Sequence, residues 1–134
     1  MKKKYGKFQV TAMVSDAFVN AKDEINELYY EMREWADNME MGGLDHLEKF
    51  QEVESAADAL ESANDYLDDI CIESQDEITF LDVRKRYYAR WLRLSNAVNV
   101  LEAVLEWANG QEWIDDMKEA VAAVEDIEFP SMYG

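Results

Sequence analysis

The sequence contains one cysteine, one histidine and one proline among 134 residues, and only five glycines. A single cysteine, Cys71, cannot form an internal disulfide, which fits a reducing compartment, and we expect it to be a small buried side chain. With so few glycines and prolines, long helices have few places to break. No stretch approaches the roughly 18 consecutive apolar residues of a membrane span. We therefore expect a soluble, cytoplasmic protein without membrane contact.

Cations are also scarce. Thirteen Lys and Arg residues face 30 Asp and Glu residues, which gives a formal charge of −17. Hydrophobic residues nevertheless make up 49% of the chain, enough to fill one core, so a disordered acidic tail is excluded. We expect a single helical domain over residues 1–134. Direct nucleic-acid binding is not expected, because the phosphate backbone would repel so negative a chain.

Apolar residues recur at alternating intervals of three and four, which is the pattern of a buried helix face. The first run covers residues 18–39, with Ser15 or Asp16 as its N-terminal cap and Gly42 and Gly43 at its end. The second run covers residues 50–71 after a short linker, which predicts an antiparallel helical hairpin. Asn64 lies on the apolar face of this run, where a lone polar residue often sets register or the number of partners.

A Ser74 to Glu77 capping box introduces a third run over residues 80–108, and a shorter fourth run covers residues 113–127. Alternating apolar residues within 8–14 indicate a short strand or a basic arm over residues 1–14, and residues 129–134 form a C-terminal tail. The predicted fold is all-α: a helical bundle with a long hairpin, a third long helix and a shorter fourth. Its wide apolar faces also allow a homo-oligomer.

The acidic residues are concentrated, since positions 50–83 hold eleven of them and no Lys or Arg. Their spacing of three and four forms stripes along the predicted helices, where each like-charge neighbour costs roughly 0.2 to 0.5 kcal/mol. A folding requirement alone does not explain this pattern. The candidate partner-binding residues are Glu24, Glu27, Glu31 and Glu34 on the first helix and Glu54, Asp58, Glu61, Asp65, Asp68 and Asp69 on the second.

Carboxylates at this spacing stand about 5 to 6 Å apart, comparable with successive phosphates of a nucleic-acid strand. Two such helices could imitate a duplex and bind the basic groove of a host or bacterial nucleic-acid-binding protein. The alternative is that the negative surface only keeps a small protein soluble.

Catalytic motifs are scarce. His46 is the only histidine, and we expect it to cap the second helix. No zinc, calcium, phosphate-loop or dinucleotide motif is present, so no cofactor or metal and no catalytic residue is expected. The remaining enzyme alternative is a Mg²⁺-dependent all-α nucleotide pyrophosphatase, in which Glu24 and Glu27, or Glu31 and Glu34, would act with Asp65 and Asp68.

One basic segment interrupts the acidic chain, with five cations interleaved with aromatic residues: Arg84, Lys85, Arg86, Arg90 and Arg93 among Tyr87, Tyr88 and Trp91. Such a composition can grip a nucleic-acid strand. We favour an internal role, in which these cations pair with the acidic stripes of a neighbouring helix or a second subunit. Arg84 lies on the apolar spacing, so it could reach a carboxylate inside the bundle.

Two segments of the predicted hairpin carry a resemblance: Glu27-Leu28, Glu31-Met32, Glu34-Trp35 and Asp37-Asn38-Met39-Glu40, then Val53-Glu54, Ala56-Ala57 and Ala59-Leu60-Glu61. They resemble a helical hairpin of small acidic accessory proteins of tailed bacteriophages. The resemblance implies a phage or prophage protein acting in the host cytoplasm. Small acidic phage proteins include anti-restriction and anti-CRISPR inhibitors that occupy nucleic-acid sites. No functional residue carries over, because no site is defined for that hairpin.

Overall fold

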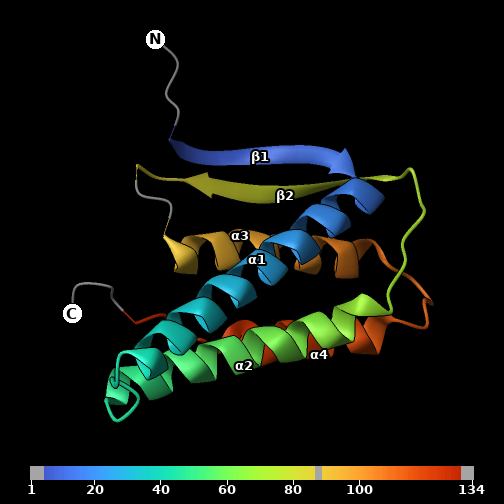
Figure 1. Ribbon diagram of the computed structural model, residues 1–134. Helices are drawn as coiled ribbons and strands as arrows, with labels where there is room; N and C mark the ends of the chain where they lie inside the picture. The colour runs from blue at the N-terminus through green and yellow to red at the C-terminus, as the bar shows by residue number, and fades with distance from the viewer. Residues whose placement is uncertain (1–4, 87–88, 131–134) are drawn as a thin grey trace.

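The computed structural model describes residues 5–86 and 89–130 (Figure 1). Its elements in chain order are β1 (Gly6–Met13), α1 (Val14–Met41), α2 (Glu48–Asp68), β2 (Glu77–Arg84), α3 (Arg90–Trp107) and α4 (Ile114–Glu125). The predicted helical character and the N-terminal strand are confirmed. The structure differs from an all-α fold by its second strand, which pairs with the first in a small antiparallel sheet.

The helices pack in a continuous arrangement around one core (Figure 1). α1 and α2 lie side by side and run in opposite directions, α1 also packs on α3, and α2 also packs on α4. Each helix contributes large side chains that are fully buried: Ile25, Leu28 and Met32 from α1, Leu60 and Leu67 from α2, Leu101 from α3, and Met117 from α4. No helix in the described part of the chain is long and apolar enough to cross a membrane.

The turn after α1 follows the pattern that Gly42 and Gly43 predict. Gly43 adopts a positive φ of 75°, which only glycine takes without steric cost. The backbone N–H of Gly43 donates to the carbonyl of Glu40, and that of Leu44 donates to the carbonyl of Met39. This pair of bonds is the Schellman motif, which satisfies carbonyls at the end of a helix.

The predicted side-chain caps are wrong. Met13 occupies the N-cap position of α1 without a side-chain bond, so neither Ser15 nor Asp16 caps it. The first N–H of the helix, that of Val14, instead donates to the carbonyl of Asp76 at 2.7 Å, because the chain enters α1 directly from a paired strand. α2 begins after Leu47, also without a side-chain cap, so His46 does not have the role expected of it.

The predicted third helix begins ten residues too early, because residues 77–84 form β2 instead. Isoleucine, threonine, phenylalanine and valine favour a strand, and β1 supplies the pairing partner that local periodicity cannot reveal. Ser74 does not open a capping box. Its hydroxyl accepts a bond from the backbone N–H of Asp76 at 3.1 Å within the loop before β2.

The positions expected for Asn64 and Cys71 have different outcomes. Asn64 is buried on the apolar face of α2, and its side-chain Nδ2 lies 3.4 Å from Oδ1 of Asn26 on α1. Its own Oδ1 has no hydrogen-bond partner among the described residues. Cys71 was expected inside the core and is exposed, because α2 ends at Asp68 and the chain then leaves the bundle.

Candidate acidic interface

Two members of the α1 stripe, Glu24 and Glu31, lie against α3. Nε of Arg93 donates to Oε1 of Glu24 at 2.6 Å, and its two terminal nitrogens donate to the two oxygens of Glu31 at 3.0 and 2.7 Å. Nε of Arg90 also donates to Glu31 at 3.0 Å. A bidentate arginine–carboxylate pair is a strong form of hydrogen bonding. These contacts therefore tie α3 to α1.

Burial makes this cluster more than a surface ion pair, since the Arg93 side chain is only 16% exposed. The hydrogen bond from Arg93 holds the pKa of Glu31 below its usual value, although partial burial acts in the opposite direction. The same bond raises the pKa of Arg93. Glu27 lies at the edge of the cluster, 3.7 Å from Arg93 and largely exposed. Glu34 is exposed beyond it.

The internal role predicted for the basic segment is confirmed for Arg90 and Arg93. Arg90 also lies over the ring of Trp35, with its guanidinium carbon 5.4 Å from the ring centroid. Arg84 differs from the expectation, because its side chain is 47% exposed; it pairs at 2.8 Å with Asp82 on its own strand. Tyr87 and Tyr88 of this segment lie outside the described residues, as do residues 1–4 of the arm and 131–134 of the tail.

The acidic stripe of α2 is more exposed and has fewer cations near it. Two cations from α1 reach it: Arg33 lies 2.9 Å from Asp58 and 3.7 Å from Glu61, and Lys22 lies 3.5 Å from Asp68. These three carboxylate side chains keep 51% to 65% of their surface in solvent. Such exposed pairs contribute only about 0 to 1 kcal/mol each.

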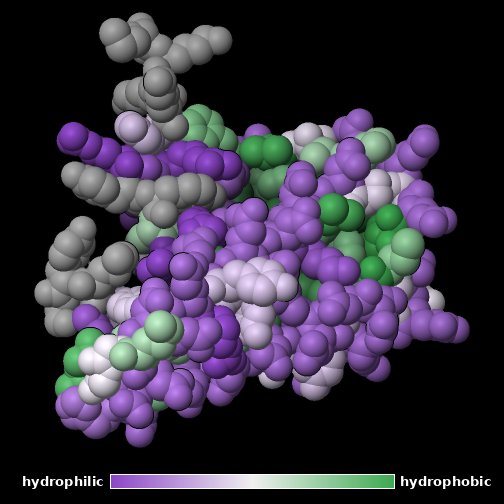
Figure 2. All heavy atoms as spheres, viewed as in Figure 1, coloured by the Kyte–Doolittle hydropathy of each residue, from purple (hydrophilic) through white to green (hydrophobic). Residues whose placement is uncertain are grey.

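Glu54 and Asp65 on α2 are also exposed, as is Asp69 directly after the helix. No ion pair within residues 5–86 and 89–130 involves them. Hydrophilic residues cover most of the surface visible in Figure 2, as expected for a chain of this charge. Of the ten predicted residues, the structure therefore engages Glu24 and Glu31 strongly with arginines and leaves the α2 residues open to water.

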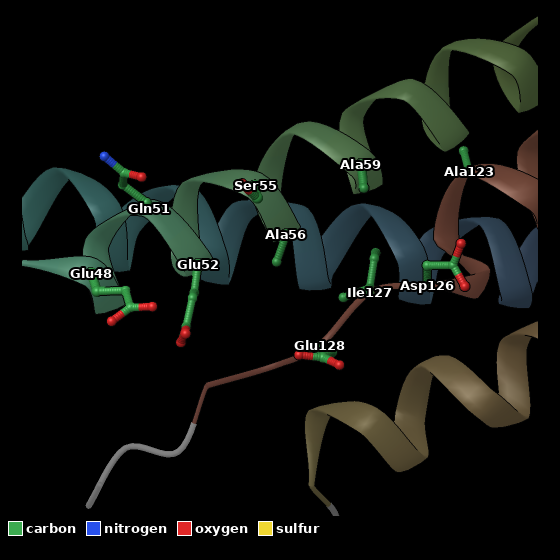
Figure 3. A pocket seen from close by; sticks show the side chains of 10 residues that line it. All are labelled: Glu48, Gln51, Glu52, Ser55, Ala56, Ala59, Ala123, Asp126, Ile127 and Glu128. Atoms are coloured by element: carbon green, nitrogen blue, oxygen red, sulfur yellow. The ribbon is translucent and has the colours of Figure 1, made fainter.

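A groove beside this stripe was not predicted. It has a volume of about 420 Å³ and lies between α2, α4 and the segment that follows α4 (Figure 3). Its lining combines small or apolar side chains with polar ones. The small or apolar residues are Ser55, Ala56, Ala59, Ala123 and Ile127, and the others are the acids Glu48, Glu52, Asp126 and Glu128 together with Gln51. Figure 3 shows the alanines of α2 and Ile127 directed into the same space.

The acids of this groove could not be placed together from sequence. Glu52 belongs to the cation-free stretch, whereas Asp126 and Glu128 are more than 70 residues away. The contact between α2 and α4 joins them, and this contact depends on tertiary packing. The available signal was the row of small residues Ser55, Ala56 and Ala59, which allows α4 to approach α2 closely.

The carboxylates proposed for Mg²⁺ are separated between different environments. Glu24 and Glu31 accept hydrogen bonds from Arg93, while Asp68 pairs with Lys22. Within the residues that the structure describes, no three His, Cys, Asp or Glu side chains form a group that could hold a metal ion.

Comparison with known proteins adds no relative: no protein-family model matches the sequence, and neither a curated protein nor a solved structure has significant similarity to it.

Proposed function

We propose that this protein is an inhibitor of the anti-restriction or anti-CRISPR type, which binds a host or bacterial nucleic-acid-binding protein through the carboxylates of α2. The observation that carries the proposal is the exposed α2 stripe within a 34-residue stretch that has no Lys or Arg. In this proposal Glu54, Asp58, Glu61, Asp65, Asp68 and Asp69 contact the partner. Glu24, Glu27 and Glu31 hold α3 in place, and Glu34 lies outside the contact.

The stripe would act through its electric field and its geometry. A helix holds successive carboxylates at fixed separations, so a groove that binds phosphates encounters a similar pattern of negative charge. Long-range attraction accelerates association and weakens as salt rises. Because Arg33 and Lys22 neutralise only part of the stripe, most of this field remains available.

The α2–α4 groove gives the proposal a more specific contact. A lysine or arginine side chain of the partner can lay its aliphatic part on Ala56 and Ala59 and direct its charge toward Glu52 or Glu128. Such a contact combines apolar burial with charge pairing, which a uniformly charged surface does not provide. The groove would thereby add orientation to an attraction that is otherwise non-directional.

The resemblance to phage hairpins implies the same function, and we propose that the protein acts in the cytoplasm of the host cell. The proposed mechanism is occupation of a site, so it needs neither a cofactor nor catalysis by this chain. Two other classes compete with it: a homo-oligomeric scaffolding protein without mimicry, and a Mg²⁺-dependent nucleotide pyrophosphatase.

Affinity capture from a bacterial lysate, followed by mass spectrometry, tests the proposal. Wild type and a Glu54→Lys, Asp65→Lys, Asp69→Lys variant are compared at low and high salt. The variant should keep its helical circular dichroism, because these three residues have no described ion pair to lose. We expect a nucleic-acid enzyme on wild type only, released by high salt and by added duplex DNA. Equal capture by both proteins would contradict the proposal.

A second variant separates the groove from net charge. Ser55→Phe places a large ring at the groove without changing any charge, and Ser55→Thr is its matched control. We expect Ser55→Phe to weaken binding to the captured enzyme about tenfold, by blocking one well-packed contact. Capture of the protein alone would favour the scaffolding class, and release of pyrophosphate from nucleoside triphosphates would favour the hydrolase.

A further inference from the structure

The two outer edges of the β1–β2 ribbon have different surroundings. α3 covers the edge of β2: the side-chain amide of Asn96 accepts from the N–H of Val83 at 3.0 Å and donates to its carbonyl at 2.9 Å. Nδ2 of Asn99 donates to the carbonyl of Leu81 at 3.1 Å. These amides take the place of a neighbouring strand. β1 has no strand beyond it in the described part of the chain, and Figure 1 shows it as the outermost element of the sheet.

The register identifies which groups of β1 point outward. Val83 and Leu81 direct their backbone away from β1, so their antiparallel partners Lys7 and Gln9 direct theirs away from β2. A two-residue period extends this set to Thr11 and Met13. Lys7, Gln9 and Thr11 therefore each present an N–H and a C=O to the open edge, whereas Met13 presents its N–H, because its carbonyl accepts the first hydrogen bond of α1.

A side-chain contact supports this assignment. Directly opposed residues that exchange no backbone bonds hold their side chains closest together. Thr11 and Thr79 form such a pair, with their hydroxyl oxygens 2.9 Å apart.

The open edge lacks most of the devices that prevent strand pairing. β1 contains no proline, its one-to-one register shows no bulge, and Lys7 is its only charged residue. A third and a fourth strand would complete both the hydrogen bonding and the sheet.

We propose that two copies of this chain pair through antiparallel β1 strands and form a continuous four-stranded sheet, with the two-fold axis at Val10. In this register Lys7 pairs with the partner's Met13, and Gln9 pairs with the partner's Thr11. Gln9 and the partner's Thr11 then exchange both backbone bonds, the N–H of Met13 donates to the carbonyl of the partner's Lys7, and the β1 edges become interior strands of the sheet.

Charge complementarity favours a second copy of the chain as the partner of the open β1 edge. Met13 is opposite Glu77 within one ribbon, so Lys7 of one copy lies two strands from the partner's Glu77 on the same face. Two strand spacings amount to about 10 Å, which the long side chains can span. Within one copy, the same two residues lie at opposite ends of the ribbon, about 20 Å apart.

Apolar contacts favour the same register. Val10 lies opposite the partner's Val10, and Phe8 lies opposite the partner's Ala12, both at closely spaced positions. Phe8 is 39% exposed in a single copy, although its side chain is large and apolar. A large ring against a small methyl group gives complementary shapes across the two-fold axis.

Sedimentation equilibrium of the full chain tests the pairing. We expect a dimer of the 15.6-kDa chain. Gln9→Pro removes an outward N–H without breaking a bond to β2, and should raise the dimer Kd about 100-fold, whereas Gln9→Thr should not. A wild-type monomer at hundreds of micromolar would overturn the proposal and leave the edge to a strand of another protein. An unchanged mass in Gln9→Pro would also overturn it.

A charge exchange tests the register. Lys7→Glu should raise the dimer Kd about tenfold, since two ion pairs become two repulsions. Adding Glu77→Lys should restore the wild-type Kd. Because the two residues are too far apart within one copy, this rescue can only occur between copies. Failure of the rescue would overturn the register.

Cross-linking provides a readout that does not depend on Gln9→Pro folding. In a Cys71→Ser background, Val10→Cys should form an intermolecular disulfide on mild oxidation, because closely spaced pairs lie about 4.5 Å apart at Cα. The matched control Phe8→Cys should not, because the two copies of residue 8 would be about 13 Å apart. Equal cross-linking of both variants would overturn the proposed axis.

Discussion

The two acidic stripes have the same chemistry and spacing but different surroundings. On α1, Glu24 and Glu31 meet Arg93, whose side chain is 16% exposed, and they become part of the contact with α3. On α2, Asp58 and Asp68 keep more than 60% of their side-chain surface in solvent. A carboxylate stripe in a sequence can therefore be either a structural contact or an available surface. The element packed against it decides which.

The largest difference between the stripes should appear when an arginine is removed from each. Arg93→Met should lower the free energy of unfolding by about 2 kcal/mol, because several charge-assisted hydrogen bonds are lost together. Arg33→Met is the matched control and should cost about 0.5 kcal/mol, since its partners are exposed. Urea unfolding at pH 7 measures both. Equal losses would contradict the distinction between the two stripes.

A pH series sharpens the same comparison. The pKa of Glu31 is lowered in the folded state, so its ionised form stabilises the protein above the usual carboxyl pKa of 4.5. This contribution is lost as the pH falls through the lower, folded-state pKa. Glu31→Gln should therefore cost about 1 kcal/mol at pH 7, and the difference from wild type should shrink below pH 4.5. A difference that does not vary between pH 7 and pH 3 would exclude this role for the carboxylate.

A smaller effect is expected where the two striped helices meet. Asn64 is buried, and its Oδ1 has no hydrogen-bond partner among the described residues. Asn64→Leu should raise the free energy of unfolding by about 1 kcal/mol, because it removes an unsatisfied buried acceptor and leaves Asn26 exposed to water. Thermal unfolding measures the change, with Asn26→Ala as a control for the partner amide. A destabilised Asn64→Leu protein would indicate that the amide is needed for packing.

Local signals in the sequence predicted those features that depend on neighbours along the chain. The three-four apolar spacing located α1, and Gly42 and Gly43 located its end. The same spacing failed at residues 80–84, because pairing with β1, some 70 residues away, decides that this segment is a strand. Helical spacing that arises by chance cannot be recognised without knowledge of that pairing.

The candidate site was predictable to a similar extent. The basic segment indicated that some acids are neutralised internally, and Arg93 confirms it. Which acids are neutralised depends on how α3 packs across α1, and this packing cannot be predicted from residue spacing. The α2–α4 groove likewise joins Glu52 to Glu128 only through tertiary packing. The spacing of residues thus locates charged faces, while the fold determines which of them remain exposed.

The central claim is that the α1 acids stabilise the fold and the α2 acids form an available surface. Two variants that each remove three negative charges test it most directly. One carries Glu24→Gln, Glu27→Gln and Glu31→Gln on α1, and the other carries Glu54→Gln, Asp65→Asn and Asp69→Asn on α2. Urea unfolding at pH 7 should show a loss of about 2 to 3 kcal/mol for the α1 variant. The α2 variant should match wild type or gain a few tenths of a kcal/mol, because repulsion between like charges is relieved. Equal changes in the two variants would contradict the account.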